Sequence, residues 1–280
     1  MILYKYVSFE AGLKILETCS LGFSNLEDFN DPFECTGFGF YDLDVPISVA
    51  INAFRNNFSR KYAILSLTRT ALNPLMWSHY GDSYKGIVIG VDTKRAGFED
   101  SDKFVIPSTK GELRYLKTVP KETIKMNIDD LMSVGNSDKL NWSNNENLLK
   151  HALLYKMHEW AYEEEIRVVK NIYPAKFSYH SPNEKEAVID EQNWKRIYSG
   201  TRPIYTIEIP QEAFVEVYVG KSAYIDQRRK QEKNGVVIQH KVDNFEKLKR
   251  LCAEINLHLS VVDIDLETWS LKSKLLHSNE

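Results

Sequence analysis

Two carboxylates and a guanidinium stand at alternate positions in the segment Glu163-Glu-Glu-Ile-Arg167. Side chains in a β-strand alternate between faces, so Glu163, Glu165 and Arg167 would share one face of a strand. A carboxylate beside an anomeric carbon can stabilise an oxocarbenium-like transition state, and an arginine can hold a phosphate or that carboxylate. The alternative is a solvated strand face with an ion pair, since surface charge runs are common.

A second group of candidates is the segment Trp77-Ser-His-Tyr80, which lies between two predicted strands. Trp77 and Tyr80 have flat rings that can stack on a nicotinamide or an adenine and contact its ribose. His79 can act as a general base. The alternative is a core cluster of aromatic residues with satisfied polar groups, together with a structural histidine.

The N-terminal part of the chain supplies a third group. A lysine between two tyrosines on a strand can bind a phosphate as a point charge, and nearby carboxylates can position a hydroxyl. The alternatives are an ordinary Asn-Asp-Pro turn and a lysine that extends to solvent. The candidate binding residues here are Tyr4, Lys5, Tyr6, Asn30, Asp31 and Glu34.

The periodicity of apolar residues predicts the elements that would position these groups. Strands are expected at 2–7, 62–68, 85–92, 112–116, 163–169, 203–209, 214–219, 236–240 and 258–264, and helices at 9–18, 46–57, 146–159 and 244–256. Ser8 is the expected cap of the first helix, and Gly22 the expected end of that helical unit. Strand-rich stretches with few helices and no regular βαβ rhythm favour an α+β fold with a largely antiparallel sheet.

The composition narrows the class of protein. The 280 residues are 43% hydrophobic, so the chain can bury a core without metals or disulfides. A formal net charge of −3 argues against bulk attraction to nucleic acid or anionic membranes. Cys19, Cys35 and Cys252 lack paired spacing, and the N-terminus enters a strand pattern directly. We therefore expect a cytoplasmic protein without a membrane segment.

Several chemistries are not indicated by any motif. Gly220-Lys221 lacks the upstream glycine of a Walker loop, and no Gly-x-Ser-x-Gly elbow occurs. His151 and His158 are seven positions apart and have no zincin-type glutamate between them. No metal ligands are expected, and no cysteine has the surroundings of a recognisable nucleophile.

Four segments together resemble a widespread bacterial family known as a domain of unknown function. The segments are Tyr4-Lys-Tyr, Phe29-Asn-Asp-Pro-Phe-Glu34, Leu75-Met-Trp-Ser-His-Tyr80 with Gly86, and Trp160-Ala-Tyr-Glu-Glu-Glu-Ile-Arg167. They occur in the family's order over roughly the first 220 residues. Each motif is short, so the resemblance depends on the combination.

The same layout is similar, more distantly, to ADP-ribosyltransferases of the DNA-modifying toxin type. The resemblance implies one ADP-ribosyltransferase-like domain over 1–280 with a split sheet, a variable insertion near 93–147 and a C-terminal helix-strand annex near 241–280. It places Glu165 at the position of the catalytic glutamate. Lys5 takes the position at which those enzymes carry His or Arg.

The function implied by the resemblance is cleavage of the nicotinamide-ribose bond of NAD. ADP-ribose would pass to water or to a macromolecule, either nucleic acid or protein, in a toxin or phage-defence role. Glu165 and His79 would be catalytic, with Glu163, Arg167, Trp77 and Tyr80 among the NAD contacts. Two alternatives stay open. One is a non-catalytic nucleotide sensor that uses the same residues, and the other is an antitoxin-like interaction protein.

Overall fold

The computed structural model describes residues 1–37, 39–40, 46–59, 61–120, 125–126, 142–172, 186–188, 194–198, 203–223, 232–233, 236–237 and 239–276. The chain forms two compact units, and each unit is assembled from separated segments. Unit 1 comprises Met1–Ser20, Leu67–Gly97 and Ile209–Glu280, and unit 2 comprises Leu21–Ser66 and Phe98–Glu208. The single domain with an insertion that the resemblance implies stays a prediction.

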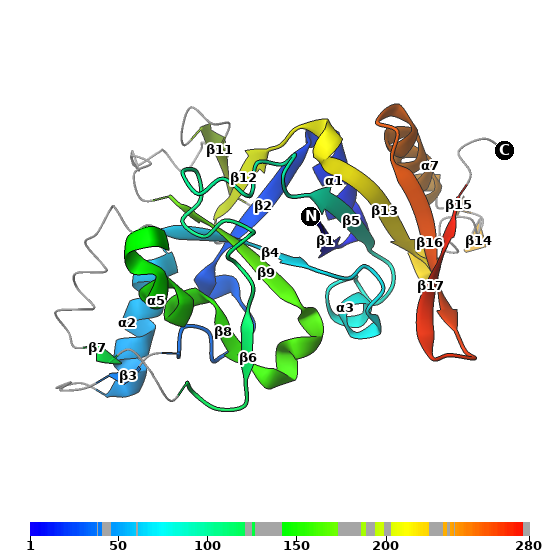
Figure 1. The fold of residues 1–280 in the computed structure, drawn as a ribbon. Helices are drawn as coiled ribbons and strands as arrows, with labels where there is room; N and C mark the ends of the chain where they lie inside the picture. Colours follow the sequence, from blue (N-terminus) through cyan, green and yellow to red (C-terminus); the bar gives the residue numbers. More distant parts are fainter. Residues whose placement is uncertain are drawn as a thin grey trace. The chain divides into compact units, whose positions relative to one another are not determined.

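Unit 1 is organised around five strands in the order β1-β5-β13-β16-β17 (Figure 1). Neighbouring strands are antiparallel except β13 and β16, which are parallel and are connected through α7. Its elements are β1 (Ile2–Val7), α1 (Phe9–Thr18), α3 (Pro74–His79), β5 (Ile87–Asp92), η3 (Gln211–Ala213), β13 (Phe214–Gly220), β14 (Glu232–Lys233), β15 (Val236–Val237), α7 (Gln239–Glu254), β16 (His258–Asp265) and β17 (Ser270–Leu275).

The strands of unit 1 have two different faces. Lys5, Ile89 and Val217 stand in one row across β1, β5 and β13, on the face that is mainly apolar. Helix α1 packs closely against this face at Gly12. A Cβ atom at that position would lie only 2.9 Å from Cδ1 of Ile87. Since side chains alternate, the other face carries a row formed by Tyr4, Gly90 and Glu216.

Unit 2 contains the strand order β10-β11-β12-β2-β4, with β9 paired to β4. Two short parallel pairs, β3 with β7 and β6 with β8, complete its described strands. Its elements are β2 (Ser20–Asn25), η1 (Leu26–Asp28), β3 (Gly39–Phe40), α2 (Ile47–Ser59), β4 (Tyr62–Thr68), β6 (Arg114–Leu116), β7 (Lys125–Met126), α5 (Trp142–Leu153), β8 (Tyr155–Met157), η2 (His158–Glu163), β9 (Glu165–Asn171), β10 (Glu186–Val188), β11 (Trp194–Tyr198) and β12 (Pro203–Glu208).

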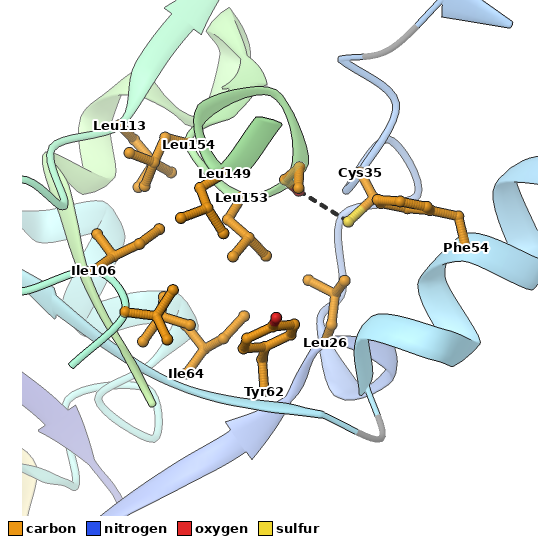
Figure 2. Close-up of a cluster of buried hydrophobic side chains, with 13 residues drawn as sticks. Leu26, Cys35, Phe54, Tyr62, Ile64, Ile106, Leu113, Leu149, Leu153 and Leu154 are labelled. Carbon is orange, nitrogen blue, oxygen red and sulfur yellow. Dashed lines mark hydrogen bonds between the residues drawn. The ribbon is translucent and has the colours of Figure 1, made fainter. Parts of the chain in front are cut away.

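The core of unit 2 lies where α2, α5, β4 and β9 supply apolar side chains (Figure 2). Leu149 and Leu153, one helical turn apart on α5, are fully buried there. The Cys35 thiol is also buried, and it donates a hydrogen bond to the carbonyl oxygen of Ala152 at 2.8 Å (Figure 2). Burial raises the pKa of this thiol well above its ordinary value, so Cys35 is a structural residue.

The expected fold class is confirmed at the level of a mixed chain with a largely antiparallel sheet and flanking helices. The ADP-ribosyltransferase-like architecture stays a prediction. Strand β1 and helix α1 have the predicted bounds, and the Ser8 side chain accepts from the Ala11 amide at 3.3 Å. No helix in the described part of the chain is long and apolar enough to cross a membrane.

Several predicted boundaries are wrong. Cys19, with a left-handed backbone (φ 47°), caps α1, whereas Gly22, the expected end of that unit, lies inside β2. The helix expected at 146–159 instead spans Trp142–Leu153, and the chain then enters β8. The last part of the strand expected at 236–240 begins α7 instead, since the helix starts at Gln239.

Candidate functional site

Arg167 is the centre of a buried ion network in unit 2. Its Nη1 and Nη2 atoms donate to Glu34 at 2.9 and 2.5 Å, and its Nε donates to Glu165 at 2.8 Å. Nη1 also donates to the carbonyl oxygen of Leu153 at 2.7 Å, and Nη2 to Glu165 at 3.3 Å. All five N–H bonds of the guanidinium therefore have an acceptor, although the side chain is 0% exposed.

Lys156 extends this network to a third carboxylate. Its ammonium donates to Glu163 at 2.5 Å and to Glu165 at 3.0 Å, and it lies 5.2 Å from the centre of the Trp160 ring. We call Glu34, Lys156, Glu163, Glu165 and Arg167 the ion network. With three carboxylates and two cations, its formal charge is −1. The side chains on both sides of each ion pair are nearly inaccessible to solvent.

Local structure explains how the carboxylates reach this position. The Asp31 side chain accepts from the Phe33 amide at 2.9 Å, which stabilises the turn that presents Glu34. Glu163 ends η2, and Glu164 then adopts a left-handed backbone (φ 44°) before β9 begins at Glu165. The prediction that one strand carries Glu163, Glu165 and Arg167 is therefore wrong for Glu163. The left-handed residue nevertheless directs Glu163 and Glu165 to the same ammonium group.

The network shifts the pKa values of Glu165 and Lys156. Burial by itself would raise the pKa of Glu165, but Arg167 and Lys156 hold it well below its ordinary value. Burial would likewise lower the pKa of Lys156, but Glu165 and Glu163 raise it above its ordinary value. Glu165 and Lys156 are therefore charged at neutral pH. The alternative of a solvated charged strand face is wrong, because both Glu165 and Arg167 are buried.

A pocket of about 230 Å³ lies against this network in unit 2. Lys156, whose ammonium group is held by the network, lines it together with the exposed Lys117. Most of the lining is apolar, and two threonines add hydroxyl groups. The remaining lining residues are Phe33, Thr36, Gly37, Leu116, Thr118, Val119, Pro120, Tyr155 and Met157.

The predicted residues of the first strand lie in unit 1. Tyr4 and Tyr6 lie on one face of β1, and the intervening Lys5 lies on the other. The Tyr6 hydroxyl donates to the carbonyl oxygen of Thr70 at 3.1 Å, and its ring packs edge-on against Trp77 at 5.6 Å. Tyr4 instead donates to Glu216 at 2.8 Å. Lys5 and the two tyrosines therefore do not form one contact surface.

The predicted aromatic segment is a short helix, α3, which Asn73 caps by accepting from the amides of Leu75 and Met76. Trp77 is fully buried, and its Nε1 donates to the carbonyl oxygen of Ala71 at 2.8 Å. Its ring also stacks on Tyr84 at 6.1 Å. Trp77 is thus a core residue of unit 1 in this structure. His79 is exposed and Tyr80 half-buried at the end of the helix.

The structure brings together four of the predicted residues, Glu34, Glu163, Glu165 and Arg167. Asp31 is buried beside the turn, whereas Asn30 is exposed. Sequence reasoning missed Lys156, because it lies in a segment predicted to be helical and its neighbours suggested no polar site. It also missed Glu216, which stands in an otherwise apolar strand. The signal in the sequence that indicates Glu216 is a charged residue inside an otherwise apolar strand.

Within the described residues, no group of three or more His, Cys, Asp or Glu side chains could hold a metal ion.

Residues 76–168 match the model of a family described as "Protein of unknown function (DUF2971)". The match is shorter than half of the chain, and it includes α3 from Met76 on and β9 up to Val168. The Tyr4–Tyr6 and Asn30–Glu34 segments precede it. No curated protein and no solved structure matches the chain.

Proposed function

We propose that this chain is a small-molecule-binding protein whose ligand occupies the pocket of unit 2. The observation that supports this proposal is that Lys156 belongs to both the pocket wall and the buried ion network. The five charged groups of the ion network are paired with one another, so the part of the pocket wall formed by Lys156 is rigid before a ligand binds. Binding therefore costs little conformational entropy there.

The size and lining of the pocket indicate the class of ligand. The pocket measures about 230 Å³. Pockets for whole drug-sized ligands usually measure roughly 300–1,000 Å³. The pocket therefore suits a single planar ring, such as the nicotinamide or the nucleobase of an NAD-like nucleotide. Phe33, Leu116 and Met157 would contact the ring, and the threonine hydroxyls would bind its polar edge.

The test is calorimetry with nicotinamide, adenosine and NAD, followed by mass spectrometry of the recovered ligand. Val119 and Val49 form a matched pair, since both are in unit 2 and are 57% and 52% exposed, but only Val119 lines the pocket. We expect Val119→Glu to abolish binding and Val49→Glu to leave it unchanged. If none of the three compounds binds saturably, or if Val119→Glu binds as well as the unchanged chain, the proposal is wrong.

The transfer of ADP-ribose implied by the family resemblance stays a prediction. In that reaction Glu165 would stabilise the ribosyl cation, but its carboxylate here accepts from Arg167 and Lys156 and is nearly inaccessible. Catalysis would require these bonds to be exchanged for contacts with NAD. NAD consumption by the unchanged chain but not by Glu165→Gln would favour transfer, whereas recovery of intact NAD would favour a sensor.

A further inference from the structure

A second polar cluster lies in unit 1. The hydroxyl of Tyr4 donates to Oε1 of Glu216 at 2.8 Å, and the hydroxyl of Tyr218 donates to Oε2 of the same carboxylate at 2.9 Å. The two rings meet edge-to-face, with centroids 6.2 Å apart. We call Tyr4, Glu216 and Tyr218 the tyrosine-carboxylate cluster.

Strand register creates this cluster. Tyr4 on β1 stands opposite Gly90 on β5, and Gly90 stands opposite Glu216 on β13. A Cβ atom at Gly90 would lie 2.8 Å from Cγ of Glu216 and 3.3 Å from Cε1 of Tyr4. The glycine therefore leaves space on the middle strand, and the side chains of the two flanking strands lean across it to meet.

In the described part of the chain, no Lys, Arg or His side chain forms an ion pair with Glu216. Burial and the neighbouring carboxylate raise the pKa of Tyr218 to about 12, and burial and Glu216 also raise the pKa of Tyr4. Both phenols therefore stay protonated donors at neutral pH. Glu216 is half-buried and is the negative group.

These features suit a positively charged partner. Each carboxylate oxygen has two acceptor positions, and the tyrosines use one on each oxygen. Aromatic faces beside a carboxylate attract cations through the ring quadrupole as well as through the charge. A half-buried carboxylate also loses part of its hydration, which strengthens an ion pair formed there relative to one on an open surface.

We propose that the tyrosine-carboxylate cluster binds a small organic cation that carries a guanidinium or ammonium group. The cation would donate to the free acceptor positions of Glu216 and contact the ring faces of Tyr4 and Tyr218. This site belongs to unit 1, so it is independent of the pocket proposed above for unit 2.

The test is an NMR titration of the full chain with methylguanidinium and methylammonium, with methylurea as the uncharged control. We expect saturable shifts of the backbone amides of Gly90, Glu216 and Tyr218 with at least one cation and none with methylurea. Glu216→Gln keeps the shape of the side chain and removes its charge, and it should weaken binding at least tenfold. Circular dichroism checks that the variant is folded.

Glu212→Gln is the matched control, because Glu212 is an exposed carboxylate of the same unit close to β13. It should bind the cation as the unchanged chain does. Shifts that are spread over the acidic surface and persist in Glu216→Gln would overturn the proposal, and so would the absence of saturable shifts with both cations. Neither result depends on whether the pocket of unit 2 binds its ligand.

Discussion

At the scale of single residues, the ion network shows how a charged strand segment can be buried. Arg167 uses every N–H bond, and Glu34, which lies 133 positions away in the sequence, accepts two of them. Removing one partner of a buried pair leaves an uncompensated charge, whereas an exposed pair exchanges its partner for water. The sequence segment around Arg167 alone does not distinguish these two cases.

Arg167→Met should lower the free energy of unfolding by about 3–5 kcal/mol, since Glu34 and Glu165 would lose their shared cation. Chemical denaturation followed by circular dichroism measures this change. The control is Arg95→Met, which removes a surface pair whose arginine side chain is 62% exposed and should cost at most about 1 kcal/mol. Equal losses in both variants would mean that the network contributes no more than a surface pair.

The network also predicts the direction of pH dependence. The folded-state pKa of Glu165 lies below its ordinary value of 4.5, so its contribution to stability is present above that pH and is lost as the pH falls further. We expect the denaturant concentration at the midpoint of unfolding to decrease as the pH is lowered from about 5 to about 3. Glu165→Gln should flatten this dependence, but Asp263→Asn, at an exposed pair with Lys221, should change it little. A slope unchanged in Glu165→Gln would contradict this assignment.

At the scale of elements, close backbone approach places β9 beside the segment that contains Gly111. The amide of Arg167 donates to the carbonyl oxygen of Gly111 at 2.9 Å, and a Cβ atom at Gly111 would lie 1.8 Å from the carbonyl oxygen of Arg167. No side chain fits at this distance. The position of Arg167 therefore depends on a glycine in a neighbouring segment.

Gly111→Ala should destabilise the chain by about 1–3 kcal/mol, because the backbone must shift to admit the methyl group. It should also weaken ligand binding in unit 2, since β9 carries Glu165 and Arg167. Denaturation and calorimetry measure the two effects. Lys110→Ala, at the exposed neighbouring position, should change stability by no more than about 0.5 kcal/mol. A fully stable Gly111→Ala variant would show that this contact is adjustable.

At the scale of the whole molecule, the path of the chain makes the two units interdependent in folding. Unit 1 is built from three segments and unit 2 from two, and β4 continues past the boundary at Ser66. Unit 2 takes β2 and β4 from its first segment and β9 to β12 from its second. Neither unit is therefore one continuous stretch of sequence.

A fragment of residues 98–208 should consequently show no cooperative unfolding transition, although it contains most of unit 2. It lacks β2 and β4, so β9 would lose its partner β4, and β12 would keep only β11 of its two neighbouring strands. Thermal circular dichroism and NMR dispersion measure this directly, with the full chain as the control. A cooperative transition in the fragment would show that its remaining strands form an independent core.

The sequence by itself determined the local elements. Alternation and capping predicted β1, α1 and β4 with their observed bounds, because these depend on neighbouring residues. Strand alternation also predicts the segment with Glu165 and Arg167, and the Asn-Asp-Pro turn marks the segment with Glu34. Only the tertiary structure decided that Lys156 joins them, that Trp77 is buried, and that Tyr4 meets Glu216, 212 positions away. Such contacts depend on strand order and register, which local patterns of polarity do not specify.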